Sequence, residues 1–196
     1  MRSVSRALAV VSFAVLAAAC GKAPAEQAIK AAEAAVQAAQ PEVEKFVPAE
    51  WKSLADGLAG ARSQFEQGQY KEALASAQAL LPKVQAAVAA AAAKKTELTS
   101  AFASLSASLP GALDALSKQL TAYAAMRKLP AGIDKAAVAA AQAEIPNVVS
   151  AWGGATAAYE SGDLMKAVDT ALQVKSKVDD LSKTFLPTAA GAPAAQ

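Results

Sequence analysis

The chain offers few residues whose types and spacing could carry out a reaction. Two pairs of carboxylates lie close in sequence, Glu42 with Glu44 and Asp179 with Asp180. Paired carboxylates can act as general acid and base, but these stand among polar, helix-favouring residues, as on a solvated helix face. Histidine, the commonest general base and metal ligand, is absent from the sequence. We therefore expect no enzyme activity, no metal site and no cofactor.

The single cysteine, Cys20, ends an uncharged segment near the start of the chain. Arg2 and Arg6 precede this segment, which covers residues 7–19 and finishes in three alanines. A positive start, a short apolar stretch and small residues at the end are typical of a signal peptide. The stretch is shorter than the roughly 20 apolar residues of a membrane-spanning helix. We expect residues 1–19 to be removed from the mature protein.

The residues around Cys20 resemble the lipobox of bacterial lipoproteins, although Ala17 stands where that motif usually has leucine. The resemblance implies that the Cys20 thiol carries a lipid and that acyl groups attach the mature chain to a membrane. An ordinary secretory signal, which would leave Cys20 as an unpaired thiol, is the alternative. Gly21 would be the second residue of the mature chain. In the sorting rule of Gram-negative lipoproteins, an aspartate at that position is an inner-membrane retention signal. By resemblance, glycine there favours the outer membrane, with the protein facing the periplasm.

Charge composition argues against nucleic-acid binding. The formal net charge of +2 is that of Arg2 and Arg6, so a chain cut before Cys20 is formally neutral. No basic stripe with interleaved aromatic residues occurs, which a DNA or RNA binder would need. The expected partners are therefore a membrane, through the acyl groups on Cys20, and a protein of the cell envelope.

After a short tether at residues 20–27, the chain is rich in the strongest helix formers as far as residue 186. Apolar residues recur at three- and four-residue spacing, as in helices that pack through one face. Pro41 is expected to kink or divide its helix, and Pro82 to bend the helix that contains it. Breaks are expected at Val47-Pro48, at two glycine turns, at Pro110-Gly111 and in the loop 129–134, where Asp134 is a candidate N-cap. The expected fold is all-α: one bundle of about six antiparallel helices over residues 28–186, with a disordered tail at residues 187–196.

Two helical hairpins, residues 48–95 and 134–185, share one pattern. The sequence aromatic-Glu-x-Gly-x-apolar-x-x-Ala occurs at residues 65–73 and again at residues 159–167. Within each copy, Gly68 or Gly162 is expected to adopt a positive φ in a tight turn. An internal duplication explains the pattern, and convergence on a common hairpin is the alternative.

The first hairpin resembles the helix-turn-helix centre of a tetratricopeptide repeat, although the repeat period differs from the usual 34 residues or so. Residues 22–98 resemble an uncharacterised family of Ala-rich helical envelope lipoproteins, some of whose members carry OmpA-like peptidoglycan-binding domains. The resemblance rests on the lipobox, the Ala-rich first helix, Val47-Pro48-Ala-Glu-Trp and the Gly-x-Tyr turn. It implies a location and a fold, and no activity.

Aromatic side chains on the hairpins are candidates for packing or for recognising a partner: Trp51, Phe65, Tyr70, Trp152 and Tyr159. Core packing in matching hairpins explains the tryptophans most simply. We expect a non-enzymatic, lipid-anchored helical protein that acts as an interaction or scaffold module of the cell envelope. A carrier that holds an apolar or lipid ligand between alanine-lined helices is the alternative.

Overall fold

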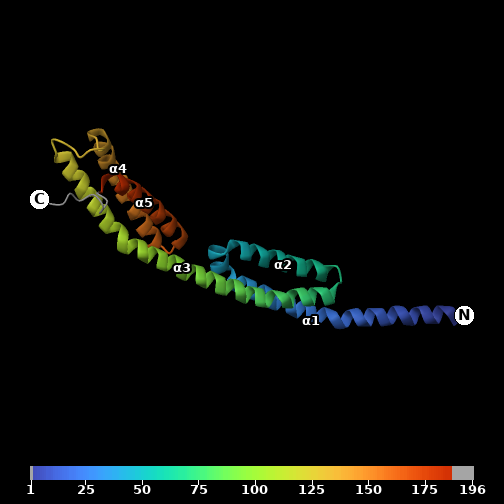
Figure 1. Cartoon of the computed structure of the whole chain (residues 1–196). Coiled ribbons are helices and arrows are strands. Elements are labelled where there is room, and N and C mark those ends of the chain that lie inside the picture. Colours follow the sequence, from blue (N-terminus) through green and yellow to red (C-terminus); the bar gives the residue numbers. More distant parts are fainter. Residues whose placement is uncertain (1, 187–196) are drawn as a thin grey trace. The chain divides into compact units, whose positions relative to one another are not determined.

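The computed structural model describes the backbone of residues 2–186 and the side chains of residues 21–186. Its helices, shown in Figure 1, are α1 (Arg2–Phe46), α2 (Pro48–Glu66), α3 (Tyr70–Ala125), α4 (Lys135–Glu160) and α5 (Leu164–Phe185). No strand occurs among the described residues, so the predicted all-α class is confirmed. The predicted tail at residues 187–196 lies outside them.

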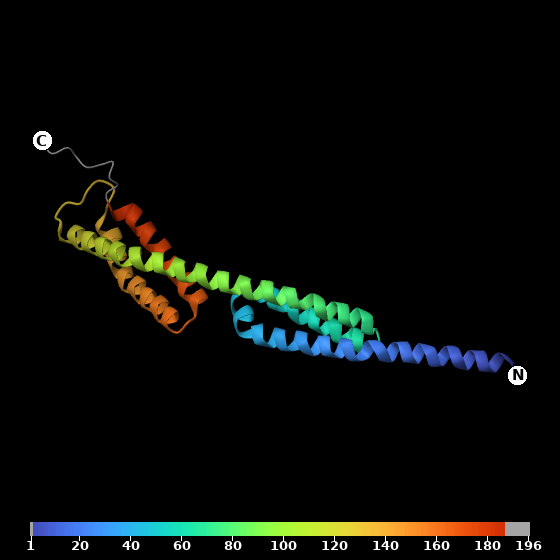
Figure 2. The ribbon, with the colours of Figure 1, turned by 90° about the horizontal axis from the view of Figure 1, so that it is seen from below.

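The helices form two compact units instead of the single bundle predicted from the sequence. Unit 1 covers Met1–Lys95 and unit 2 covers Thr96–Gln196. The first part of α3 belongs to unit 1, together with α1 and α2, and the rest of α3 belongs to unit 2, together with α4 and α5. Figure 2 shows α4 and α5, in orange and red, beside the later part of α3. Within the described part of the chain, each unit is thus built from three helices.

The prediction of six helices is wrong, because α3 continues where the sequence suggests a bend or an end. It runs through Pro82 and through Pro110-Gly111 without interruption. Both prolines are exposed. Because proline has no N–H, a carbonyl one turn earlier lacks its helical hydrogen bond, and at an exposed position water can hydrate it. The four-residue step from Leu109 to Leu113, both buried, also keeps the helical spacing of the apolar face across the Pro-Gly pair.

Helix α1 also starts earlier than the sequence suggests. Residues 21–27, predicted to be part of a tether, are helical, and Ala25 is fully buried. A Cβ atom added to Gly21 would lie 3.4 Å from the Cβ atom of Tyr70 in the first turn of α3. Pro41 does not divide the helix. Packing in unit 1 therefore starts directly after Cys20.

The turns between α2 and α3 and between α4 and α5 have the same backbone geometry. Gly68 has a φ of +77° and Gly162 a φ of +80°, as predicted. The Gly68 N–H donates to the carbonyl of Phe65 at 3.0 Å, and the Gly162 N–H donates to that of Tyr159 at 2.9 Å. In each turn the next N–H donates to the carbonyl five residues earlier at 2.9 Å. These bonds satisfy the last carbonyls of α2 and α4 in the manner of a glycine C-cap.

Two further helix boundaries fall where the sequence predicts them. α2 begins at Pro48, directly after Val47, and α4 begins after Asp134. The Asp134 carboxylate accepts a hydrogen bond from the backbone N–H of Ala137 at 2.7 Å. This cap satisfies one of the free N–H groups in the first turn of α4.

The two cores differ in side-chain size, and neither contains a charged or polar residue among the described side chains. Half of the buried residues of unit 1 are alanines. The full set of buried residues in this unit is Ala25, Ile29, Ala32, Val36, Ala39, Val43, Phe46, Leu54, Leu58, Ala61, Ala73, Ala77, Leu80, Val84, Ala87 and Ala91. In unit 2, the part of α3 that joins the core contributes larger side chains: Leu98, Phe102, Leu105, Leu109, Leu113, Leu116, Leu120 and Tyr123.

Candidate functional site

The carboxylates that stand close in sequence take part in exposed ion pairs and hydrogen bonds. Glu42 accepts from the Lys95 ammonium at 3.3 Å, and Asp180 accepts from Lys183 at 3.1 Å. The other two members of these pairs accept from a neighbour on their own helix. Among the described residues, no three Asp, Glu, Cys or His side chains are grouped as metal ligands would be. These carboxylates therefore lie on solvated helix faces, as the sequence predicts.

Cys20 lies within α1, but its side chain is not among those that the structure describes. Gly21, the predicted sorting residue, is the first described side-chain position and lies against Tyr70. None of the helices in the described part of the chain combines the length and apolar character needed to cross a bilayer. Attachment through Cys20 stays a prediction from the sequence.

The candidate aromatic residues are all half-buried: Trp51, Phe65, Tyr70, Trp152 and Tyr159. In unit 1, the Phe65 and Tyr70 rings meet edge to face across the glycine turn, with centroids 5.2 Å apart. In unit 2, the Phe102 ring of α3 stacks on Tyr159 at 4.2 Å and on Trp152 at 5.7 Å. Four of the five thus help to pack their own unit while keeping part of their surface exposed.

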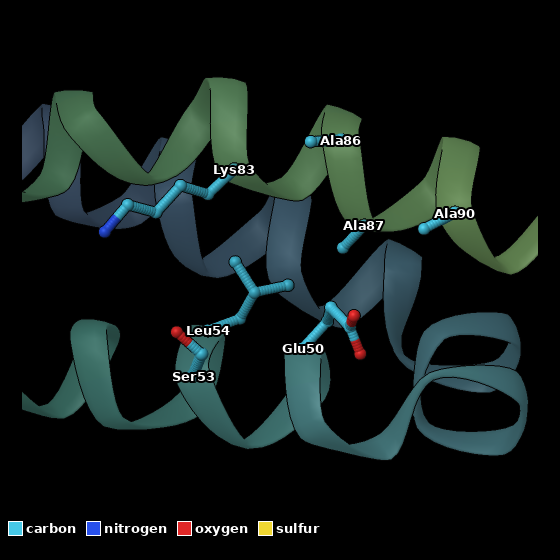
Figure 3. Close-up of a pocket in the computed structure, with 7 residues that line it drawn as sticks. All are labelled: Glu50, Ser53, Leu54, Lys83, Ala86, Ala87 and Ala90. Atoms are coloured by element: carbon cyan, nitrogen blue, oxygen red, sulfur yellow. The ribbon is translucent and has the colours of Figure 1, made fainter.

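A groove of about 350 Å³ lies between α2 and α3 in unit 1. Its lining residues are drawn in Figure 3: Glu50, Ser53, Leu54, Lys83, Ala86, Ala87 and Ala90. Leu54 and Ala87 are buried and form the floor of the groove. Ala86 and Ala90 line the α3 side with small side chains. The Glu50 carboxylate lies near Ala87 and Ala90, whereas the Lys83 side chain extends away from Glu50 (Figure 3). We call this the α2–α3 groove.

A second groove, of about 280 Å³, lies between α4 and α5 in unit 2 and is called the α4–α5 groove. It is lined by Glu144, Asn147, Val148, Ala151, Thr170, Gln173, Val174 and Lys177. The Lys177 ammonium lies 3.4 Å from the Glu144 carboxylate, so an ion pair between α4 and α5 joins the two sides of this groove.

The two grooves carry the same pair of charged residue types at matching positions. Glu144 and Lys177 follow Glu50 and Lys83 by the same 94 residues that separate the two glycine turns. In unit 2 the two side chains form an ion pair, whereas the side chains of Glu50 and Lys83 form no ion pair or hydrogen bond with another described residue. The α2–α3 groove therefore has a free acid toward one end and a free base toward the other.

Four of the five charged groups that line a groove on the other side of α2 are already paired, and Glu66 is the fifth. A groove of about 230 Å³ between α1 and α2 includes Glu26, Lys30, Glu33 and Arg62. The hydrogen bond from Lys30 to Glu26, 2.8 Å long, and the attraction between their charges lower the pKa of Glu26 and raise that of Lys30. Arg62 donates to Glu33 at 2.7 Å. The α2–α3 groove is therefore the better candidate for an external partner.

Lys83 was not singled out from the sequence, and Glu50 was included only as part of the Val47-Pro48-Ala-Glu-Trp segment. The recurrence of Glu and Lys at the separation of the glycine turns was the available signal. The groove itself depends on how α2 packs on α3, which the spacing of apolar residues does not determine.

Comparison with known proteins adds no relative. No family model, no curated protein and no solved structure matches the chain.

Proposed function

We propose that the protein is a lipid-anchored helical module of the bacterial cell envelope, attached through Cys20 to the outer membrane and facing the periplasm. It is not an enzyme and works by contact with other proteins. The observation that carries the proposal is the lipobox-like segment that ends at Cys20. The early start of packing supports it, since α1 contacts α3 from Gly21 onward and the predicted cleavage would leave the packed part of unit 1 whole.

The anchor is tested by replacing the thiol that would carry it. Cys20→Ala in the full-length chain should abolish incorporation of a labelled fatty acid and move the protein out of the membrane fraction. Ser12→Ala, which alters the apolar stretch without touching the cysteine, is the matched control and should keep both properties. Continued labelling and unchanged fractionation of Cys20→Ala would reject the anchor.

The proposed outer-membrane location rests on Gly21. Gly21→Asp should shift the protein toward inner-membrane fractions, whereas Gly21→Ser should leave it in the outer membrane. A new Cβ at this position lies at an ordinary contact distance from Tyr70, so both variants should fold. Equal distribution of the two variants would contradict the sorting proposal.

Repeat-like hairpins are the second element of the proposal. The matching hydrogen bonds of the Gly68 and Gly162 turns and the matching grooves support descent of the two units from one ancestral hairpin. In this view each unit presents one groove between its last two helices. Convergence on a common hairpin explains the turns but does not require Glu and Lys at the same positions in both grooves.

A carrier of an apolar or lipid ligand is the second candidate, favoured by the apolar floor of the α2–α3 groove. Leu54 and Ala87 form that floor, and Ala86 and Ala90 extend its apolar surface. Native mass spectrometry of the purified full-length protein tests this function. A bound lipid that is lost in Ala86→Trp, which would fill the groove, would favour the carrier over the interaction module.

A further inference from the structure

We propose that the α2–α3 groove binds the same groove of a second copy of the chain, with Glu50 of each copy facing Lys83 of the other. The inference names one partner of the proposed interaction module. It is tested on purified protein, so its failure is distinct from failure of the membrane anchor.

The distribution of charge in the groove is self-complementary. Lys83 and Ala90 are seven residues apart on α3, which is about 10 Å along a helix. Glu50 lies near the Ala90 end, so acid and base occupy opposite ends of this length (Figure 3). A two-fold axis perpendicular to α3 near Ala86 exchanges the ends, because the same patch meets itself in such an interface. The acid of one copy then faces the base of the other at both ends.

The groove is also lined mainly by small side chains. On α3 they are Ala86 and Ala90 beside the floor residue Ala87, and on α2 the small residue is Ser53. Small side chains let two helices approach toward the short end of the usual interaxial range of about 8–10 Å. In an antiparallel arrangement, α3 of each copy would lie in the groove of the other, giving a bundle of four helices.

The α4–α5 groove shows what the same residue types do when they meet. There Lys177 and Glu144 attract each other across the groove within one chain, at 3.4 Å. In the α2–α3 groove the two side chains point apart, which leaves both charges available to another copy. A partner of a different kind would have to supply one base and one acid at the same separation, whereas a second copy supplies both without further assumption.

The test is a charge swap in the full-length protein, purified in mild detergent and measured by sedimentation and by crosslinking. Glu50→Lys and Lys83→Glu should each weaken self-association by about tenfold or more, because each places like charges opposite each other at both ends of the interface. The double variant Glu50→Lys/Lys83→Glu should restore association to near the original strength. The matched swap of Glu144 and Lys177, alone or together, should leave association unchanged.

Crosslinking locates the contact. The Ala86→Cys variant carries its new thiol near the proposed axis and should give a covalent dimer with a short bismaleimide, above the background set by Cys20 in the unmodified chain. Asp180→Cys, at the matching position of unit 2, should not. Circular dichroism should show the same helix content in all variants, since the changed side chains are exposed or line the groove.

Three results would overturn the inference. The first is a protein that stays monomeric at high micromolar concentration. The second is a dimer that is indifferent to the single swaps, or is not restored by the double swap. The third is crosslinking of the Ala86→Cys variant to a different protein when the reaction is run on intact cells, with no dimer of this chain.

Discussion

Unit 1 and unit 2 each contain two helices joined by a Gly-centred turn, and they differ in the helix that covers this pair. In both, two helices joined by a Gly-centred turn bury matching positions; Ala73, Ala77 and Leu80 of unit 1 correspond to Ala167, Ala171 and Val174 of unit 2. The third helix of unit 1 is α1, which buries Ala, Val and Ile with one Phe, whereas in unit 2 it is the leucine-rich part of α3. Two helices joined by such a turn therefore pack against either kind of third helix.

This difference sets an expected order of stability. The hydrophobic contribution scales with apolar area removed from water, at about 25 cal/mol per Å², and a leucine buries more area than an alanine. Unit 2 should therefore survive to a higher denaturant concentration than unit 1. The chain provides one tryptophan reporter in each unit, Trp51 and Trp152, so the order can be measured by fluorescence when the other tryptophan is replaced by phenylalanine.

The largest expected effect comes from emptying one core at a time. Leu120 of unit 2 is fully buried and Leu54 of unit 1 is 2 % exposed. Replacing either by alanine should lower the free energy of unfolding of its own unit by about 2–5 kcal/mol, from lost transfer energy and the remaining cavity. Leu120→Ala should shift the Trp152 transition and Leu54→Ala the Trp51 transition.

Each substitution serves as the control for the other, because both remove the same atoms from a buried site. Independent shifts would support two units that unfold separately. Equal shifts of both tryptophan signals in either variant would show that the chain unfolds as one cooperative unit, and the comparison of two stabilities would lose its meaning.

The glycine turns should respond alike in the two units. Gly68→Ala and Gly162→Ala place a side chain on a backbone of positive φ, which costs about 1–2 kcal/mol. Denaturant unfolding followed at Trp51 and Trp152 should show similar losses. Gly60→Ala is the control, since Gly60 is inside α2 with no neighbour within 4 Å of a new Cβ, and it should gain up to about 1 kcal/mol. Clearly unequal losses at the two turns would argue against their equivalence.

Local signals were enough to predict the helical class, the glycine turns and the Asp134 cap, because each depends on a few neighbouring residues. The predicted number of helices was wrong because packing outweighs the local rule that proline bends or ends a helix. Pro82 and Pro110 disfavour helix, but at exposed positions their cost is small beside the packing of the apolar face. A boundary between units in the middle of α3 is harder still to predict, since Lys95 and Thr96 carry no break in helix propensity.

The grooves mark a further limit of sequence reasoning. The spacing of apolar residues identifies which face of a helix is buried. Groove formation depends instead on how far two packed helices diverge, which is set by the sizes of residues that meet across the interface. The free Glu50 and Lys83 became visible only when the packed hairpins were compared.

Helix capping differs between the units. We expect the type of cap found in unit 2 to stabilise unit 1 when it is introduced at the matching position. The Asp163 carboxylate accepts from the Lys166 N–H at 3.3 Å at the start of α5. At the matching position before α3 the residue is Gln69, which is not among the favoured N-cap residues. Asp163→Ala should cost about 1 kcal/mol in unit 2, and Gln69→Asp should gain up to about as much in unit 1. Denaturation curves at the two tryptophans measure both, and Gln69→Asn serves as an uncharged control. A loss of stability in Gln69→Asp would show that the turns differ more than their backbones suggest.

The smallest expected effect tests the packing contact that adjoins the α2–α3 groove. A Cβ on Gly57 would lie 2.7 Å from Cδ2 of Leu80, whereas unit 2 combines Ala151 with the shorter Val174 at the matching positions. Gly57→Ala gains about 1 kcal/mol of helix propensity, but the buried Leu80 must move, so the net change should fall below 0.5 kcal/mol or so. Leu80→Val alone should cost about 1 kcal/mol for the lost methylene.

Made together, Gly57→Ala and Leu80→Val reproduce the pairing of unit 2, and each should relieve the cost of the other. A double-mutant cycle on the Trp51 transition should then give a favourable coupling of about 0.5–1 kcal/mol. Gly60→Ala in place of Gly57→Ala should give none, since Gly60 has no neighbour to relieve. Zero coupling for the Gly57 pair would mean that Leu80 already moves aside freely, and that the spacing of α2 and α3 is set elsewhere than at this contact.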